Sequence, residues 1–436
     1  MSTPLTIMFW PESAYGPTNQ CIGVAAKLRE RGHRIIFAAE SSWAGKIEKY
    51  GFVEELVDLA EPSPDDADAD AGQFWTDFIA ETAPEFAKPT IEQIESFIAP
   101  TFQALIDGAK YSEARLREII ATHQPDVIVE DNVILFPALA TAGKPFVRFI
   151  SCSPLEVPGP DVPPPFSGLP SDDPSQWESY RAEFDRVLRP MWADFDAWVR
   201  AQGAAPLPEL EFMPRDNAAT IYIYPAEADY VDRRALDDSW TRVDSSIRET
   251  DEAYELPPSI ARRPEGSALV YLSLGSLGAA DVALMQRLVD VLGGTPHRFI
   301  VSKGPQADQI RLADNMVGEQ MLPQTRIIPL VDAVISHGGN NTTTESLHFG
   351  KPLIVLPLFW DQYENAQRVD ELNLGVRLDT YHFADGDLVD ARNDALLAVD
   401  PEARIVPYML SGGTDAQAFS RLGIRCFGFA PLRLPP

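Results

Sequence analysis

Residues 335–345 read Ile-Ser-His-Gly-Gly-Asn-Asn-Thr-Thr-Thr-Glu, and this segment carries the strongest structural signal in the chain. An apolar run ends at Ser336, a pair of glycines then allows a tight turn, and we expect a helix to begin near Asn341. The positive end of that helix, together with its backbone N–H groups and the side chains of Asn341 and Thr342, would attract an anion. The segment therefore predicts a strand, a glycine turn and a helix that bind a phosphate group.

Two side chains of the same segment have predicted roles of their own. We expect His337 at the tip of the strand, where its imidazole could donate a proton or a hydrogen bond to a phosphate oxygen. Glu345 would lie about one turn into the helix, where its carboxylate could accept hydrogen bonds from ribose hydroxyls. A plain glycine turn beside a surface histidine is the alternative, and the following segment weakens it.

That following segment, residues 351–369, reads KPLIVLPLFWDQYENAQRV. Trp360, Asp361 and Gln362 fall where a predicted strand ends and a predicted helix begins. An acid and an amide at this point can bind sugar hydroxyls, and the aromatic ring can close the pocket. The alternative interpretation is that Asp361 only caps the helix.

Strand and helix patterns alternate through both halves of the chain. Expected strands cover residues 5–10, 34–38, 126–129, 145–150, 220–224, 268–273, 298–302, 333–336 and 353–356. A first helix is expected after a possible Asn19 cap. A second covers residues 92–120, with an interruption near Pro100. The further expected helices cover residues 174–202, 281–292, 343–349 and 361–373. This alternation predicts an α/β fold with two Rossmann-like, doubly wound domains that face a ligand cleft.

The composition suggests where these domains meet. Residues 248–266 are charged and proline-rich without periodicity, which is typical of a linker. We therefore expect an acceptor-binding domain at 1–247, a linker at 248–266, a nucleotide-sugar domain at 267–385 and an atypical tail at 386–436.

Charge and cysteine usage exclude several classes of function. The 436 residues carry a formal net charge of −29, which argues against binding to nucleic acid or to an anionic membrane surface. Cys21, Cys152 and Cys426 are far apart and odd in number, which fits reduced thiols better than a disulfide framework. No run of 18 apolar residues occurs, so we expect a cytoplasmic protein without a stable membrane anchor.

Residues 321–377 resemble the donor-binding signature of family 1 glycosyltransferases, which are GT-B enzymes that move a sugar from a nucleotide diphosphate to a small acceptor. The spacings match the family: eight residues separate His337 from Glu345, and twenty-four separate it from Asp361. Residues 271–276 (YLSLGS) resemble the second diphosphate loop, and residues 302–304 resemble the strand end beside the nucleoside. The similarity runs from about residue 5 to about residue 380 and is strongest in the second half.

The resemblance implies roles for a set of donor-binding residues. His337 and Ser276 would hold the diphosphate, Asn341 and Thr342 its oxygens, Glu345 the ribose, and Asp361 with Gln362 the sugar. Completing the set are Lys303, Met321, Gln324, Gly339, Asn340 and Trp360. The co-substrate would be a UDP-sugar, with glucose as the expected sugar and no metal or other cofactor. Met321 stands where the family usually stacks a tryptophan on uracil, so the base preference is less defined than diphosphate binding.

The acceptor half departs from the family pattern. Family members commonly have Gly-His-x-x-Pro with the histidine as general base, whereas Pro17 occupies that position here and cannot accept a proton. The candidate bases are Asp131, Glu130 and Glu12, with Asp131 first, because a buried carboxylate of raised pKa is an adequate base. A helix-capping role for Asp131, an acidic acceptor that needs little help, and weak catalysis stay open. Expected acceptor walls are Trp10, Tyr15, Gly16, Phe136 and the loop 154–170.

The tail does not fit this family. Residues 411–416 read SGGTDA and resemble the C-terminal part of zinc-dependent exopeptidases and deacylases of the acetylornithine deacetylase and carboxypeptidase G type, which suggests a chimeric or frameshifted end. Three functions follow in order: an inverting UDP-glycosyltransferase, a nucleotide-sugar-binding protein with little turnover, and a metallopeptidase-like hydrolase. The partners of the first are a nucleotide sugar and a small hydrophobic acceptor.

Overall fold

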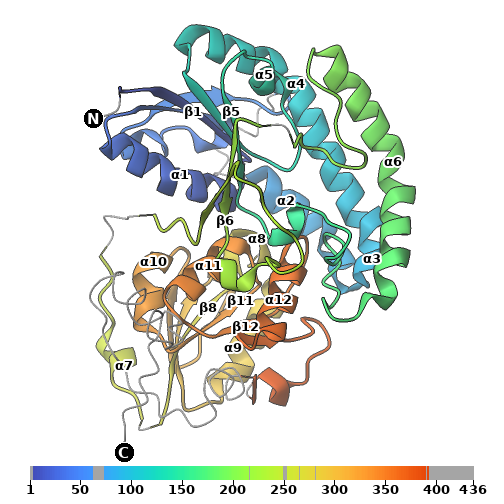
Figure 1. Cartoon of the computed structure of the whole chain (residues 1–436). Helices are drawn as coiled ribbons and strands as arrows, with labels where there is room; N and C mark the ends of the chain where they lie inside the picture. Colours follow the sequence, from blue (N-terminus) through green and yellow to red (C-terminus); the bar gives the residue numbers. More distant parts are fainter. Residues whose placement is uncertain are drawn as a thin grey trace, which may run out of the picture. The chain divides into compact units, whose positions relative to one another are not determined.

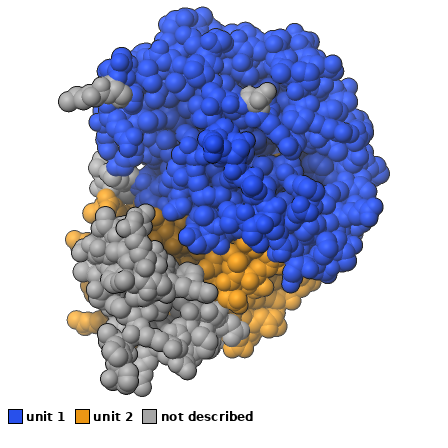
Figure 2. All heavy atoms as spheres, in the orientation of Figure 1, with its two compact units in different colours: residues 1–248 blue, residues 249–436 orange. Residues whose placement is uncertain are grey.

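The computed structural model describes residues 3–61, 73–215, 217–248, 253–264, 266–279, 281–388 and 390–391. The chain divides into two compact units, residues 1–248 (unit 1) and residues 249–436 (unit 2), which are coloured separately in Figure 2. Each unit contains one parallel sheet with helices around it. The predicted α/β class with two Rossmann-like, doubly wound sheets is confirmed.

Unit 1 contains a seven-stranded sheet in which every neighbouring pair is parallel. Its strands are β1 (Thr6–Pro11), β2 (Arg34–Glu40), β3 (Val53–Val57), β4 (Val127–Asp131), β5 (Phe146–Ile150), β6 (Ala219–Ile223) and β7 (Trp240–Val243). The strand order is β3-β2-β1-β4-β5-β6-β7. The winding direction therefore reverses between β1 and β4, which is the place where ligands bind in sheets of this kind.

Helices of unit 1 cover this sheet. Three are long enough to span several turns: α1 (Tyr15–Glu30), α4 (Ala99–His123) and α6 (Trp177–Ala201). The last two pack side by side (Figure 1). The shorter elements are α2 (Gln73–Thr82), α3 (Thr90–Gln93), α5 (Pro137–Ala140), a π-turn at Ile94–Ile98, and 3-10 turns at Ser41–Trp43, Glu48–Tyr50, Ala83–Ala87, Pro154–Glu156, Pro174–Gln176 and Ala226–Ala228.

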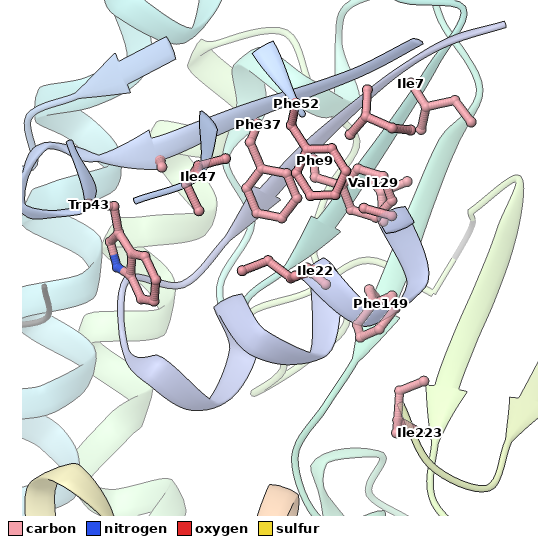
Figure 3. Packing of buried hydrophobic residues seen from close by; sticks show 14 residues of the cluster. Ile7, Phe9, Ile22, Phe37, Trp43, Ile47, Phe52, Val129, Phe149 and Ile223 are labelled. Atoms are coloured by element: carbon pink, nitrogen blue, oxygen red, sulfur yellow. The ribbon is translucent and has the colours of Figure 1, made fainter. Parts of the chain in front are cut away.

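One core of unit 1 lies between α1 and the sheet. Phe9 of β1 stacks on Phe37 of β2 with ring centroids 5.5 Å apart, and Phe37 stacks on Phe52 at the same distance. Ile22 of α1 and Val129 of β4 belong to the same buried cluster (Figure 3). Because alternate residues of a strand point to opposite faces, this cluster fixes which side chains of β1 and β4 face α1.

Unit 2 repeats the same topology with six parallel strands in the order β10-β9-β8-β11-β12-β13. The strands are β8 (Leu269–Ser273), β9 (Arg298–Ser302), β10 (Met316–Glu319), β11 (Ala333–Ser336), β12 (Leu353–Val355) and β13 (Gly375–Arg377). The helices are α7 (Pro258–Ala261), α8 (Gly275–Gly278), α9 (Val282–Gly293), α10 (Gln324–Ile327), α11 (Asn340–His348) and α12 (Gln362–Glu371), with 3-10 turns at Ala307–Gln309 and Ile328–Leu330. Here the winding reverses between β8 and β11.

Two helix predictions need correction. The first helix begins at Tyr15 rather than after Asn19, with Ala14 as its N-cap residue, and a Glu12 carboxylate oxygen accepts the backbone N–H of Ala14 at 3.1 Å. Pro17 fits inside its first turn, where a missing N–H costs nothing. The interruption expected near Pro100 is instead a π-turn just before α4, which places the proline at the start of that helix.

The ends of unit 2 extend beyond the predicted boundaries of its domain. Ile260, inside the predicted linker, is 1% exposed and belongs to the core of unit 2. Leu388, inside the predicted tail, is fully buried and lines a small apolar cavity with Val270 and Leu292. The peptidase-like motif at 411–416 lies outside the described residues. None of the helices in the described part of the chain combines the length and apolar character needed to cross a membrane.

Candidate active site

The imidazole of His337 lies between two glycines at the carboxyl ends of β8 and β11. A Cβ atom added to Gly275 would come within 2.6 Å of His337 Cε1, and one added to Gly339 would come within 2.5 Å of Nε2. Gly275 also has a φ of +72°, which favours glycine. Both backbone segments therefore approach the ring more closely than any larger residue would allow.

Burial sets the charge of this histidine. The side chain is 9% exposed and bonds to the backbone of Ser273, while Ser336 Oγ lies 3.3 Å from Nδ1. Loss of solvent around the ring lowers the pKa of His337 to about 4, although the bond to Ser273 acts in the opposite direction. The imidazole is therefore neutral at pH 7 and has a single N–H, so a phosphate oxygen must compete with the backbone of Ser273 for that hydrogen bond.

The turn between His337 and α11 is held by two hydrogen bonds. The N–H of Gly338 donates to Ser336 Oγ at 3.2 Å, and Asn365 Nδ2 donates to the Gly338 carbonyl at 2.8 Å. Gly338 has a φ of +90°, and a Cβ there would come within 2.7 Å of the side chain of Val355. The N-cap residue of the following helix is Gly339, which has no side chain that could cap it, and the positive end of the helix dipole at this point favours an anion.

Gln324 connects two predicted donor residues of α11. Its Nε2 donates to Glu345 Oε2 at 2.7 Å and lies 3.2 Å from Thr342 Oγ1. Glu345 is only 2% exposed, so the amide fixes one carboxylate oxygen in a buried setting. The structure thus brings Gln324, Thr342 and Glu345 together, although α10 and α11 are separate helices.

The loop between β12 and α12 restricts what Gln362 can bind. Its Oε1 accepts the N–H groups of Leu358 at 3.0 Å and Phe359 at 3.3 Å, which leaves the amide NH₂ as the group for a sugar hydroxyl. Asp361 occupies the N-cap position of α12, as the alternative interpretation expected, but its side chain makes no capping hydrogen bond. Trp360 has a φ of +57°, which for a bulky residue costs about 1–3 kcal/mol and is typical of functional loops.

The other predicted donor residues differ in their surroundings. Lys303 Nζ donates to the carbonyl of Ala307 at 3.0 Å, and Met321 is 58% exposed. Asn340, 6% exposed, opens α11, and Asn341 follows it, half-buried. Ser276 follows Gly275 in α8, and its side chain is outside the described part of the chain.

In unit 1, Asp131 ends β4 at the point where the winding of the sheet reverses. It is 4% exposed, with Oδ1 accepting from Ser151 Oγ at 3.1 Å and Oδ2 accepting from Cys21 Sγ at 3.7 Å. Burial raises the pKa of Asp131 well above its usual range, and the nearby carboxyl groups of Glu156 and Glu12 raise it further, against the two hydrogen bonds. A raised pKa makes the ionised form a stronger base.

The other two candidate bases have structural partners. Glu130 lies on the opposite face of the sheet from Asp131, is fully buried, and accepts the N–H of Phe136 at 3.0 Å. Burial raises the pKa of Glu130 well above its usual range. Glu12 accepts hydrogen bonds from the hydroxyl of Ser13 and from the backbone of Ala14.

The predicted acceptor walls divide between the two faces of this sheet. Trp10 pairs in register with Glu130, so both point to the same face, and its ring meets Phe136 edge to face at 5.2 Å. Both rings are at most 2% exposed. Tyr15 and Gly16 are half-buried in the first turn of α1. The structure therefore brings Trp10 and Phe136 to Glu130 rather than to Asp131.

The chain is similar to several known proteins. Residues 261–398 match the family described as UDP-glucoronosyl and UDP-glucosyl transferase. NDP-glycosyltransferase YjiC of Bacillus subtilis is 26% identical, over 84% of this chain and 82% of the relative. Oleandomycin glycosyltransferase of Streptomyces antibioticus is also 26% identical, over 92% and 84%. The solved structure of the glycotransferase of kitacinnamycin has a TM-score of 0.63 at 20% identity over 92% of both chains, which shows the same GT-B fold.

The chain is a glycosyltransferase. The residues that match the UDP-glucoronosyl and UDP-glucosyl transferase family lie in unit 2, which contains His337 and Glu345.

Three polar residues of this glycosyltransferase were not predicted from its sequence. Asn365 holds the Gly338 carbonyl, whereas Ser151 and Cys21 hold Asp131. A signal existed for Asn365, which follows Gln362 by three residues and so shares its helix face. Ser151 follows β5 and Cys21 lies on α1, so no local spacing could link them to Asp131.

Replacing Gly339 by alanine tests whether the position of His337 matters for donor binding. Gly339 has a φ of −58°, so alanine fits the backbone and only its Cβ meets the imidazole. We expect the affinity for UDP to fall at least about tenfold, or about 1.4 kcal/mol, by titration calorimetry. Gly386→Ala is the control, because a Cβ there meets no atom within 4 Å. Equal affinities in the two variants would contradict the prediction.

Replacing Glu130 by glutamine tests whether this residue is structural. A carboxyl group whose pKa is raised in the folded state destabilises the protein as the pH rises from the pKa of the unfolded state toward that of the folded state. Glutamine removes this loss of stability and keeps a side-chain oxygen that accepts the N–H of Phe136. The neighbouring charges, Arg148, Asp131 and Glu113, stay in place. We expect Tm at pH 8 to rise by about 2 °C or more, with little change at pH 4.

Glu118→Gln serves as the control for Glu130→Gln, because the side chain of Glu118 on α4 is exposed. Sugar transfer should persist in both variants. Loss of transfer in Glu130→Gln alone, at unchanged UDP affinity, would make Glu130 a catalytic residue.

Proposed function

We propose that this glycosyltransferase transfers a hexose, with UDP-glucose as the expected donor, to a hydroxyl of a small hydrophobic acceptor and inverts the anomeric carbon. The observation that carries the proposal is the arrangement of His337, the uncapped start of α11 and the Glu345 carboxylate held by Gln324. A relative named for oleandomycin supports a small-molecule acceptor, and one named an NDP-glycosyltransferase supports a nucleotide diphosphate. The proposal includes no metal and no further cofactor.

Each part of the donor has a matching group in unit 2. The diphosphate accepts hydrogen bonds from the neutral His337 and from the first N–H groups of α11, where the helix dipole also favours negative charge. Glu345 accepts hydrogen bonds from the ribose hydroxyls. The sugar is bound by the Asp361 carboxylate and by the NH₂ group of Gln362, whose Oε1 already accepts backbone N–H groups.

The transfer step needs a base and a stabilised leaving group. Asp131 in its ionised form takes the proton of the acceptor hydroxyl, and the acceptor oxygen forms the new bond to the anomeric carbon. The bond from that carbon to the diphosphate oxygen breaks, and the electron pair leaves with the diphosphate. Fixed donors around this oxygen lower the barrier, because they stabilise the charge that develops there.

A second function keeps one observation in its favour. Pro17 occupies the position of the family's base, and it lies in the first turn of α1, where proline is well accommodated. A chain with this residue could bind a nucleotide sugar with little turnover. The hydrolase interpretation has no supporting observation in the described residues.

Glu345→Ala tests donor binding. Loss of the carboxylate should weaken UDP and UDP-glucose binding at least about tenfold in titration calorimetry, because the ribose hydroxyls of the bound nucleotide would lose their hydrogen-bond acceptor. Asp308→Ala, an exposed carboxylate of the same unit, should bind like the wild type. TDP-glucose in the same series reports the base preference. Failure of the wild type to bind any of these nucleotides would rule out both functions.

Asp131→Asn tests the base. With 2-phenylethanol as acceptor we expect kcat to fall at least about 100-fold, the typical contribution of a general base, at unchanged UDP affinity. With 4-nitrophenol the loss should be smaller, because this acceptor ionises unaided near neutral pH. Equal losses with both acceptors would contradict the assignment. Wild-type binding without any transfer would support the second function instead.

A further inference from the structure

Asp131 is held at both carboxylate oxygens by side chains that no motif of the family assigns. Ser151, which follows β5, donates to Oδ1 at 3.1 Å, and Cys21 of α1 donates to Oδ2 at 3.7 Å. Both donors are buried, with Ser151 4% and Cys21 0% exposed. The backbone adds a third constraint, because the carbonyl of Asp131 accepts the N–H of Glu12 at 2.8 Å.

We propose that Ser151 and Cys21 are positioning residues for the catalytic carboxylate of Asp131, and that this fixed carboxylate replaces the histidine absent at Pro17. The inference rests on the proposed function, because it gives Asp131 the role of base. Two donors on two oxygens fix the plane of the carboxyl group, so one lone pair of an oxygen stays aimed at the acceptor hydroxyl.

The thiol suits this role because it keeps its proton. Burial raises the pKa of the Cys21 thiol well above its usual range, and the neighbouring Asp131 raises it further. Cys21 therefore acts as an S–H donor and not as a nucleophile. Hydrogen bonds from Cys21 and Ser151 favour the ionised carboxylate.

Two carboxyl groups act on Asp131 in the opposite sense. Glu156 and Glu12 lie close enough to disfavour its ionised form, and so raise its pKa. Glu156 is paired with Arg148 at 2.8 Å, which holds this carboxylate in place. The groups that face Asp131 are thus two donors, from α1 and the end of β5, and two acids, from the end of β1 and the 3-10 turn Pro154–Glu156.

The two donors and the two acids shift the pKa of Asp131 in opposite directions, so the pH dependence of catalysis distinguishes a positioning role from a merely structural one. Since the base must be ionised, loss of a donor should reduce kcat/KM more at pH 6 than at pH 9. For Ser151→Ala and Cys21→Ala, we expect the pH 6 to pH 9 ratio of kcat/KM to fall about threefold or more. Cys21→Ser, which keeps a donor, should restore the wild-type ratio. Glu156→Gln should raise the ratio, because it removes a negative charge but keeps the partner of Arg148.

The readout is UDP release from UDP-glucose, with 2-phenylethanol as acceptor because its hydroxyl does not titrate between pH 6 and pH 9. Transfer to water is counted as well. Ser112→Ala is the matched control, since this buried serine of α4 donates to the carbonyl of Ala109 and should leave the profile unchanged.

The outcomes separate this inference from the proposed function. Equal losses at both pH values in Ser151→Ala and Cys21→Ala, with Asp131→Asn inactive, would overturn the positioning role and leave the base assignment intact. An active Asp131→Asn, or a wild type that releases no UDP, would overturn the base assignment and this inference with it.

Discussion

The reversal of winding in each parallel sheet is the constraint on which the rest of the structure depends. Between β1 and β4, and again between β8 and β11, the crossovers depart in opposite directions, so the carboxyl ends of these strands stay open. Pro11 pairs with Asp131 at the first reversal, and Ser273 pairs with Ser336 at the second. Asp131 ends β4 and His337 follows β11, so the two sheets present their reactive side chains at equivalent points.

Burial acts on both of these side chains and favours the uncharged form of each. It raises the pKa of the Asp131 carboxyl and lowers the pKa of the His337 imidazole. An uncharged imidazole still gives a leaving diphosphate a hydrogen-bond donor, and a carboxyl of raised pKa becomes a stronger base once ionised. In the proposed reaction, the same desolvation would prepare one sheet to stabilise a leaving group and the other to accept a proton.

The sequence was sufficient for the centre of each sheet and failed at its margins. All four strands that went unpredicted, β3, β7, β10 and β13, are edge strands. They are short or charged, as in the VEELV of β3 and the GVR of β13, because an edge strand is only partly buried and need not be apolar. Most of the residues proposed to bind the donor could be grouped from the sequence, because they lie in two consecutive loop-helix segments. The neighbours of Asp131 could not, because Ser151 follows β5, Cys21 lies on α1, and only the fold brings them together.

Pro17 shows why unit 1 can depart from the pattern of family 1 glycosyltransferases without losing the fold. The first turn of a helix has N–H groups without intrahelical partners, so proline removes nothing that α1 requires, and Glu12 still bonds to the backbone at its start. Loss of a histidine there removes a base but leaves the end of β4 unchanged. The carboxylate at that end is already buried and bonded at both oxygens. In the proposed mechanism, proton transfer would therefore move from a helix side chain to the sheet, where the backbone of β4 fixes the position of Asp131.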